Sequence, residues 1–483
     1  MVLSRRAFLA TGVAGGTASA FGQQKLYLDD PDRLWGSTHF GADWRQHTGG
    51  FWDGVDEASK PVMEAARRGI ERIRKRDFEL RITGPDGQPA SGEIEIQHVE
   101  HEFQFGVNIS GVPGDGPRIL PHTRQTALEA ADELFSIVRV GAHMSSQAEP
   151  GGPYRFDRVD RDVAWAKAHG KAMRYHSLIY QMMIPAWHWQ VRTEAEWWPI
   201  MERYIAAVAD RYGDDIHDYD AINEMVSNVR WRRDRPRLTF PPLHDPLISK
   251  RVIELCRKHL PDAVLVSLED GWPADENGIW RAIYEFQKDL VATDAPFDAI
   301  GTQCHFYTYN DVPFQAGHPR SGPGAFTMAS IGRGFDLLGS LGKPVFVPEH
   351  NPPSRNNNFW WTQPRLTDEE IASWTENFYT LAFSKPYIKQ LVRWFLIDNV
   401  QGRGMDAGIV AENGGKKPVY YALRKLLKQT WSTHWQGTPD ASGAVSIRGY
   451  HGTYEAKGRG FKPARFVVAE NGPRRISVAL KPS

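Results

Sequence analysis

Eight short apolar runs, separated by segments with helical periodicity, fill most of the middle of this 483-residue chain. The runs begin at Phe103, Phe135, Lys171, Asp218, Ala263, Phe297, Pro344 and Gln390. Segments such as RVDRDVAWAKAHG and LISKRVIELCRKHL lie between them. Strands that alternate with helices pair in parallel, and eight of them fit a closed barrel better than an open doubly wound sheet, which usually has fewer strands. We therefore predict an α/β fold, a (β/α)8 TIM barrel.

Polar side chains stand where several of the predicted strands end. In a parallel barrel, the residues at the C-terminal ends of the strands meet at one mouth and form the reaction site. The predicted strand ends carry Asn223, Glu224, Asp270, Gln303, His305, Glu349, His350 and Trp394. We therefore expect these side chains to converge.

Two glutamates among these residues point to a reaction. Glu224 closes the fourth run, in DAINE, and Glu349 closes the seventh, in VFVPEHN, so the two can face each other across a ligand. Glycosidic cleavage uses two carboxyl groups, one to protonate the leaving oxygen and one to attack or stabilise the sugar. Burial and a neighbouring carboxylate keep the donor protonated, and His305 or His350 could hold the ionised partner by hydrogen bonding.

The motifs DAINE, IGTQCHF, PVFVPEH and RYHSLIYQMMIPAW resemble those of the retaining glycoside hydrolases with catalytic glutamates on strands four and seven. More narrowly, they resemble glycoside hydrolase family 10, the xylanases, from about Phe103 to Leu427. The resemblance implies a (β/α)8 barrel and double displacement with retention at the anomeric carbon. It implies that Glu224 is the acid/base and Glu349 the nucleophile.

The same resemblance implies a set of sugar-binding residues. Asn223 would bond the sugar 2-hydroxyl, and His305 would orient the nucleophile with Gln303 beside it. His176 would line the glycone subsite, whose floor would be Trp394. Gln181 stands where the family has a second histidine on the third-strand loop.

The end of the second strand departs from the family. Val140, Gly141 and Met144 stand where the family usually has a Glu-Asn pair and a Lys, so three polar contacts to the sugar are lost. The sugar hydroxyls must find other partners, for which His143, Ser145 and Ser146 are candidates, or the substrate must differ. Xylan is the first expectation and a different β-glycan is the alternative.

A carbohydrate-binding barrel without turnover is the alternative outside the enzymes. The presence of both Glu224 and Glu349 counts against it, because a protein that only binds has no need for two costly buried carboxylates. We therefore expect an enzyme, with a polysaccharide or oligosaccharide as its partner.

The first twenty residues have the features of an export signal. Arg5-Arg6 precedes an apolar run that ends in Ala18-Ser19-Ala20, which resembles a twin-arginine signal and predicts a periplasmic or extracellular bacterial protein. No later segment has 18 or more uncharged apolar residues, so we expect no membrane span.

Outside the barrel, the pattern predicts smaller units. We expect a leader and helix over 21–77, in which the basic amphipathic helix spans Val62–Asp77. We further expect a β-hairpin over 78–101 with a turn at Gly84–Gly87, the catalytic barrel over 102–430, and a β-module over 431–483. The hairpin is a candidate part of that module. The module aromatics Trp431, Trp435, Tyr450 and Tyr454 are candidate sugar-binding residues, although such modules more often only pack on their barrel.

The charge balance and the cysteine content limit the classes of partner and ligand that we expect. Lys plus Arg and Asp plus Glu both number 58, and this balance argues against nucleic acid as the main partner. Cys256 and Cys304 are expected to be buried thiols rather than a disulfide. No Cys/His cluster has metal-ligand spacing, so we expect neither a metal nor a cofactor. The loop NNNFWWT, over 356–362, is a further candidate for sugar stacking, and the oligomeric state stays open.

Overall fold

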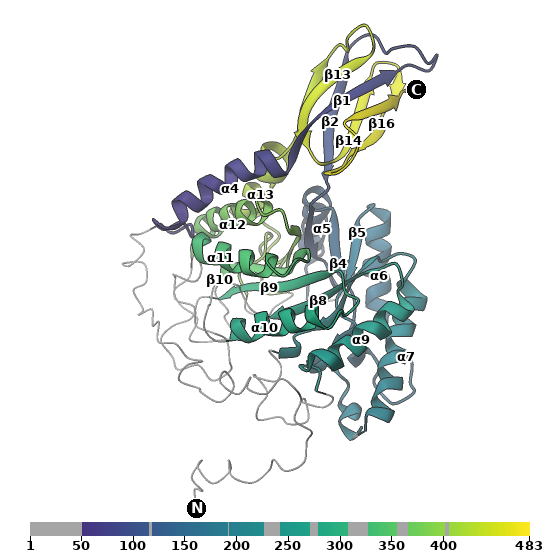
Figure 1. The fold of residues 1–483 in the computed structure, drawn as a ribbon, viewed down its shortest axis with the longest axis vertical. Helices are drawn as coiled ribbons and strands as arrows, with labels where there is room; N and C mark the ends of the chain where they lie inside the picture. Colours follow the sequence, from purple (N-terminus) through teal and green to yellow (C-terminus); the bar gives the residue numbers. More distant parts are fainter. Residues whose placement is uncertain are drawn as a thin grey trace, which may run out of the picture.

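The computed structural model describes residues 51–114, 118–191, 193–226, 242–270, 279–307, 327–354, 366–400 and 405–483. The predicted export signal over 1–20, the leader up to residue 50 and the aromatic loop over 356–362 lie outside these ranges. Two bodies are visible in Figure 1, a large one built around parallel strands and a smaller β-module beside it.

Eight parallel strands close into a barrel, as predicted. In barrel order they are β3 (Gln104–Asn108), β4 (Ile137–Val140), β5 (Ala172–Tyr175), β7 (Asp218–Asn223), β8 (Val264–Asp270), β9 (Ala299–Tyr307), β10 (Val345–Ser354) and β11 (Ile388–Arg393). Each strand pairs with the next, β11 pairs with β3, and the pairing of β5 with β7 closes the ring. The short strand β6 (Ile179–Tyr180) also lies beside β7. All eight predicted apolar runs therefore coincide with barrel strands.

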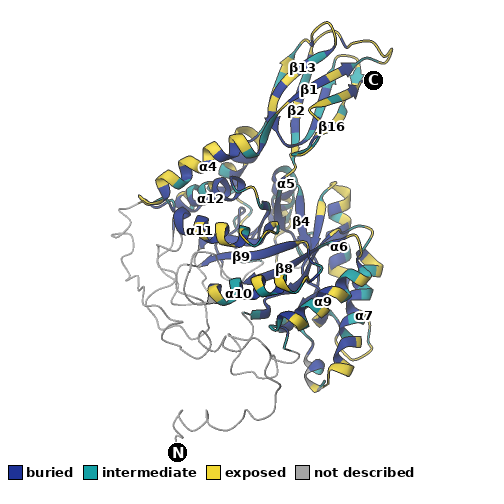
Figure 2. Ribbon diagram, in the orientation of Figure 1, coloured by how far each residue is buried: buried dark blue, intermediate teal, exposed yellow. Residues whose placement is uncertain are grey.

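Helices surround the barrel and turn their apolar sides toward it, so that their exposed residues face outward in Figure 2. They are α5 (Pro121–Leu134), α6 (Asp157–Ala168), α7 (Glu194–Tyr212), α9 (Pro246–His259), α10 (Ile279–Ala292), α11 (Met328–Gly339), α12 (Asp368–Phe383) and α13 (Pro418–Lys425). Capping boxes fix the starts of α7 and α12, because Thr193 and Thr367 each accept a backbone bond that a glutamate three residues later reciprocates.

The barrel interior is partly polar. Arg174 on β5 is fully buried and reaches both Asp220 on the neighbouring strand β7 and Gln390 on β11, which β4 and β3 separate from β5 along one side of the ring. The amide of Gln390 donates in turn to Asp218, at 2.6 Å. A buried guanidinium is tolerated when it is paired in this way. This network ties three strands together directly below the mouth.

The β-module is built from both ends of the chain. In one sheet β1 (Lys75–Thr83) lies between β13 (Ala444–Tyr450) and β17 (Arg475–Ala479); in the other, the order is β12 (His434–Gly437), β2 (Ile94–His101), β14 (Gly452–Gly458) and β16 (Ala464–Val468). The short strands β15 (Phe461–Lys462) and β18 (Lys481–Pro482) pair with each other. The sheets share an apolar core that includes Phe78, Leu80, Ile96 and Phe466. The prediction of a hairpin over 78–101 was wrong, because β1 and β2 lie in different sheets, and each of these two N-terminal strands completes one sheet of the C-terminal module.

The module aromatics serve mainly as packing residues. Trp431, Tyr450 and Tyr454 are buried, and half-buried Trp435 packs against the module core. A ring buried inside the protein has no face left for a sugar. The first three therefore do not form a sugar-binding surface.

The helix before the module is shorter than predicted. Helix α4 (Ser59–Ile73) ends at Ile73 rather than Asp77, and β1 begins at Lys75. Strand pairing with β13 takes Lys75–Asp77 out of the helix. Arg74, between the two elements, is buried and donates to the carbonyl oxygens of Phe383 and Ile388 at 2.7 and 2.8 Å. The boundary was wrong because these long-range contacts outweigh the local helical pattern.

Two further expectations concern the chain as a whole. Cys256 and Cys304 are both buried free thiols, as predicted. None of the helices that the structure describes has the length and apolar character that a membrane crossing requires.

Candidate active site

Glu224 follows the last residue of β7 and has an unusual backbone conformation. Its φ angle is +58°, in the left-handed region that non-glycine residues seldom adopt. Its N–H donates to the carbonyl oxygen of Leu268 on β8 at 2.9 Å, which holds the turn in place. Strained backbone of this kind is concentrated at functional sites, because the surrounding structure must enforce it.

The carboxyl group of Glu224 is buried and surrounded by neutral donors. The Tyr180 hydroxyl donates to Oε2 at 2.8 Å, and Gln303 Nε2 donates to Oε1 at 3.1 Å. Gln303 also donates to Oδ1 of Asn223 at 3.1 Å, which fixes that amide beside the carboxyl group. Burial, followed by the charge of Glu349, raises the pKa of Glu224 to about 7, although the two hydrogen bonds oppose the rise. This carboxyl group can therefore carry a transferable proton near neutral pH.

Glu349 on β10 is also buried, but it lies between two imidazoles. Its Oε2 accepts a hydrogen bond from His305 Nε2 at 3.0 Å. Its Oε1 lies 3.2 Å from His176 Nδ1, a nitrogen that donates instead to Asp220 Oδ2 at 2.8 Å. Within the described residues, Oε1 of Glu349 has no hydrogen bond. One oxygen is thus fixed while the other is available to attack.

His305 is held in its charged form. Its Nδ1 lies 2.6 Å from Oδ1 of Asn351, and the amide nitrogen of Asn351 donates to the carbonyl oxygens of Phe306 and Pro352. Those two bonds orient the amide so that its oxygen faces the imidazole, and both ring nitrogens therefore face acceptors. Burial alone would lower the pKa of His305, but the hydrogen bond and charge of Glu349 outweigh it and the pKa is raised.

An aromatic side chain lies beside both imidazoles. The ring of Trp394 is 5.5 Å from that of His176 and 5.9 Å from that of His305, edge to face in both cases. The buried guanidinium of Arg139 on β4 lies 4.9 Å from the centre of the Trp394 ring. Burial lowers the pKa of His176 to about 3, so this imidazole stays neutral. Trp394 therefore lies against both of the imidazoles that flank Glu349.

The residues expected at the site form two adjoining groups. Asn223, Gln303 and Glu224 form one, and His176, His305, Trp394 and Glu349 form the other. The side-chain amide of Gln303 bonds Asn223 and Glu224, and Gln303 lies two positions before His305 on β9. Gln181 is buried and begins the 3₁₀ turn Gln181–Met183, directly after Tyr180.

The expectation that His350 could hold the ionised glutamate was wrong. His350 Nδ1 lies 2.8 Å from the carbonyl oxygen of Val392, and its ring packs against Phe378 and Tyr379 of α12. Adjacent side chains along a strand point to opposite faces. With Glu349 facing the mouth, His350 faces the helices, and His305 alone of the two bonds the carboxylate.

The sequence did not predict three residues that take part in the contacts of the site. Tyr180 was hidden in the apolar stretch SLIYQMM, 44 positions from the glutamate it contacts. Arg139 was hidden inside the run FSIVRVG. Asp220 had a usable signal, because Asp218 and Asp220 alternate within a buried strand and so place two acids on one face. Each contact depends on another strand that sequence spacing does not locate.

Asp270, at the end of β8, adds a third buried carboxyl group. Burial and the charge of Glu224 raise its pKa well above the usual value. Within the described residues, no group of three or more histidines, cysteines or acids is arranged to hold a metal ion.

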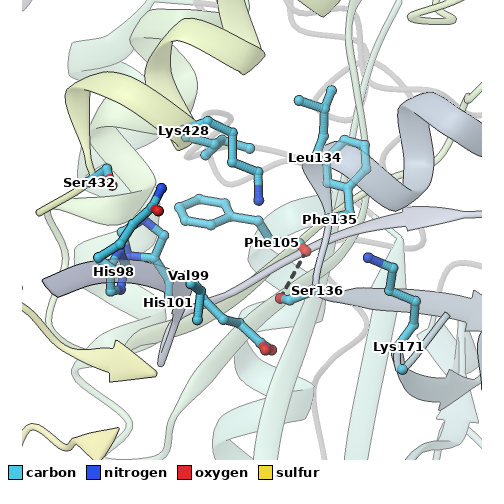
Figure 3. A pocket seen from close by; sticks show the side chains of 14 residues that line it. His98, Val99, His101, Phe105, Leu134, Phe135, Ser136, Lys171, Lys428 and Ser432 are labelled. Atoms are coloured by element: carbon cyan, nitrogen blue, oxygen red, sulfur yellow. Dashed lines mark hydrogen bonds between the residues drawn. The ribbon is translucent and has the colours of Figure 1, made fainter. Parts of the chain in front are cut away.

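A separate cavity of about 280 Å³ lies at the opposite end of the barrel (Figure 3). Residues from β2 line it together with Phe105, Ser136 and Lys171, which lie at or just before the N-terminal ends of β3, β4 and β5. The reaction site of a parallel barrel lies at the other strand ends. This cavity belongs to the seam between barrel and β-module.

Comparison with known proteins agrees with the fold. The sequence model described as "Glycosyl hydrolase family 10" matches residues 118–424. Similar proteins include Anti-sigma-I factor RsgI6 of Acetivibrio thermocellus, 21% identical over 81% of this chain and 46% of its own length. Endo-1,4-beta-xylanase 1 of Arabidopsis thaliana is 23% identical over 82% of this chain and 38% of its own length. The chain therefore spans less than half the length of these two curated relatives.

Solved structures with the same fold include xylanase 10B from Thermotoga petrophila RKU-1 in complex with xylobiose. Its TM-score is 0.53 at 17% identity, over 68% of this chain and 95% of that one. Native xylanase 10B from Thermotoga maritima gives a TM-score of 0.51, also at 17% identity, over 68% and 96%. At this identity the likeness concerns the fold. Because the family match covers well over half of the 483 residues and most of the barrel, the chain belongs to glycosyl hydrolase family 10.

Proposed function

We propose that the protein is a retaining glycoside hydrolase that cleaves β-linked glycans by double displacement, with Glu224 as acid/base and Glu349 as nucleophile. The observation that carries the proposal is the contrast between two buried carboxyl groups in one mouth. Glu224 has a raised pKa, to which the charge of Glu349 contributes, and Glu349 has one oxygen fixed by His305 and one unbonded. A proton donor beside a nucleophile is what double displacement requires.

The first step joins Glu349 to the sugar. Its Oε1 attacks the anomeric carbon as the glycosidic bond breaks, and the proton of Glu224 passes to the leaving oxygen. The imidazolium of His305 remains hydrogen-bonded to Oε2 and stabilises the carboxylate before attack. In the second step Glu224 takes a proton from water, the water oxygen attacks the anomeric carbon, and the bond to Glu349 breaks. Two inversions give net retention.

The sugar contacts are part of the proposal. Asn223, whose amide is fixed by Gln303, binds the 2-hydroxyl. His176 and Trp394 line the glycone subsite, and Gln181 completes its wall. Hydrogen bonds to the 2-hydroxyl that strengthen in the transition state contribute to glycosidase catalysis.

Xylan-like chains are the first substrate class that we propose, because several similar proteins are named endo-1,4-beta-xylanases. The alternative is the same mechanism on a different β-glycan. Val140, Gly141 and Met144 favour that alternative, since they offer no polar side-chain atoms for sugar hydroxyls.

The N-terminal pattern around Arg5-Arg6 supports twin-arginine export to the periplasm or the medium.

A barrel that binds glycans without turnover is the second candidate. One similar protein is named as an anti-sigma factor and not as an enzyme, which favours keeping this alternative. The intact pair of glutamates supports catalysis.

The deciding experiment assays the purified protein against aryl β-glycosides and β-linked polysaccharides, xylan included, with Glu349→Ala in parallel. We expect turnover on at least one substrate and its loss in the variant. Saturable glycan binding with no turnover would favour the second candidate. Turnover that survives Glu349→Ala would contradict the proposed mechanism.

A further inference from the structure

The end of β4 forms one wall of the mouth and offers few polar groups. Val140 and Met144 are buried apolar residues. Gly141 has a φ angle of +132°, and a Cβ atom there would lie 2.6 Å from the carbonyl oxygen of His176, so no side chain fits. His143 is therefore the residue of this wall that can bring polar side-chain atoms toward the sugar.

The ring of His143 lies between the partners of the two catalytic carboxyl groups. It is 5.4 Å from the ring of His176 and 5.6 Å from the ring of Tyr180, edge to face in both cases. His176 is next to Glu349, and Tyr180 donates to Glu224. A side chain that contacts both partners lies beside the space between the two carboxyl groups.

Several contacts fix His143 before any ligand arrives. The Tyr204 hydroxyl donates to the carbonyl oxygen of Ala142 at 2.9 Å, and Ser146 N–H donates to that of His143, also at 2.9 Å. Ring nitrogen Nδ1 lies 3.3 Å from the hydroxyl of Ser177. A contact residue that is already ordered costs little entropy when it binds.

The other ring nitrogen is available. His143 is half-buried, and no hydrogen bond among the described residues uses its Nε2 atom. Burial and the nearby His176, Arg139 and Arg158 hold the pKa of His143 well below the usual value, so the ring is neutral. A neutral imidazole has one donor and one acceptor, which matches a sugar hydroxyl better than it matches an anion.

We propose that His143 is a substrate-binding residue whose Nε2 bonds a hydroxyl of the sugar held between Glu224 and Glu349. The inference rests on the proposed glycosidase function and adds a specificity residue to it. Ser145 is exposed, and the Ser146 hydroxyl is sealed from solvent with no hydrogen-bond partner in the described part of the chain, so His143 is the candidate of the three that reaches the site.

The test combines three variants with a series of substrates. His143→Phe keeps the ring contacts and removes both nitrogens, His143→Gln keeps a polar group, and His434→Phe is a matched control at an exposed position in the β-module. The substrates are the aryl β-glycoside that the wild type cleaves best and its analogues that each lack one ring hydroxyl. Thermal melts check that each variant is folded.

We expect His143→Phe to lower kcat/KM on the parent substrate by roughly 10- to 100-fold, the usual range for a lost hydrogen bond to substrate. On one deoxy analogue, the variant and the wild type should be nearly equal, because the hydroxyl that His143 binds is absent. His143→Gln should recover part of the loss, and the control should match the wild type.

Equal losses on the parent and on every deoxy analogue would overturn the inference, as would an unchanged kcat/KM. If His143→Phe does not fold, His143→Ala takes its place and is judged by the same comparison: a ranking of the deoxy analogues like that of the wild type contradicts a hydroxyl contact. A wild type that cleaves none of the substrates contradicts the proposed function, which keeps the two failures apart.

Discussion

Glu224 and Glu349 are chemically identical side chains in one barrel mouth, and they differ in what surrounds them. The carboxyl group of Glu224 accepts from a phenol and an amide, both neutral. The carboxyl group of Glu349 lies against two imidazoles, one of which faces acceptors on both nitrogens and is therefore charged. Surroundings of this kind decide which of two carboxyl groups gives a proton and which attacks.

The backbone conformations of the two glutamates differ as well. Glu224 lies just beyond β7 with a left-handed φ angle. Glu349 stays within β10, where its pairing with Gln303 on β9 follows a shift in register. The proposed proton donor is thus held by a strained turn, while the proposed nucleophile is held by the sheet itself. Substitutions at four positions test this contrast, and they are described in order of decreasing expected effect.

Replacing the nucleophile should have the largest effect. We expect Glu349→Ala to lower kcat/KM by about 100,000-fold or more, since the variant lacks the carboxylate that forms the proposed covalent intermediate. Steady-state kinetics on aryl β-glycosides measure the loss. Glu129→Ala, at an exposed position on α5, is the matched control and should be fully active. A loss below about 100-fold would assign the attack to another group.

Removing the acid/base should have an effect that depends on the leaving group. Glu224→Ala should cost about 100- to 10,000-fold on substrates whose leaving oxygen needs a proton. Cleavage of a strongly activated aryl glycoside should begin with a rapid burst of released phenol and then slow, because only the second step needs the base. The same loss on every leaving group, with no burst, would argue against this role.

Substituting His305 tests whether a charged hydrogen-bond donor beside Glu349 is needed for activity. His305→Gln keeps a neutral donor near Glu349 and removes the charge, and charge-assisted bonds are roughly twice as strong as neutral ones. We expect kcat to fall roughly 10-fold with a smaller change in KM. His305→Ala should be worse than His305→Gln, and equal activities would show that the hydrogen bond is unimportant.

Substituting Tyr180 tests the role of a neutral hydrogen-bond donor beside Glu224, and it should have the smallest effect on the rate. The hydrogen bond from Tyr180 lowers the pKa of Glu224, so Tyr180→Phe should raise that pKa above its value of about 7. Because the donor must be protonated in the first step, activity falls as pH rises through this pKa. The alkaline limb of kcat/KM should therefore move to higher pH, whereas a fixed limb or a shift to lower pH would contradict the assignment.

The barrel could be predicted because its signal is local. Each strand is a short apolar run, and the helices between them have their own periodicity. Glu224 and Glu349 could be found in the same way, because each is an acid at the end of an apolar run. The contrast between the two glutamates was less accessible, because it depends on contacts that Tyr180, Asp220 and Asn351 make with side chains of other elements.

Two errors show the limit of local reasoning. Helix α4 was extended through Asp77 because the basic pattern continues, while pairing with β13 and the contacts of Arg74 end it earlier. His350 was considered as a partner of Glu349 from adjacency alone, although neighbours along a strand face opposite sides. In both cases, a partner distant in the sequence determines the geometry.

The central claim is double displacement by two differently held carboxyl groups. Its most direct test is proton NMR of the first product released from a β-glycoside, recorded before the reducing sugar equilibrates. Retention predicts that the β-anomer appears first and the α-anomer grows in later by mutarotation. An α-anomer that appears first would mean single displacement by water and would contradict the assignment of Glu349 as nucleophile.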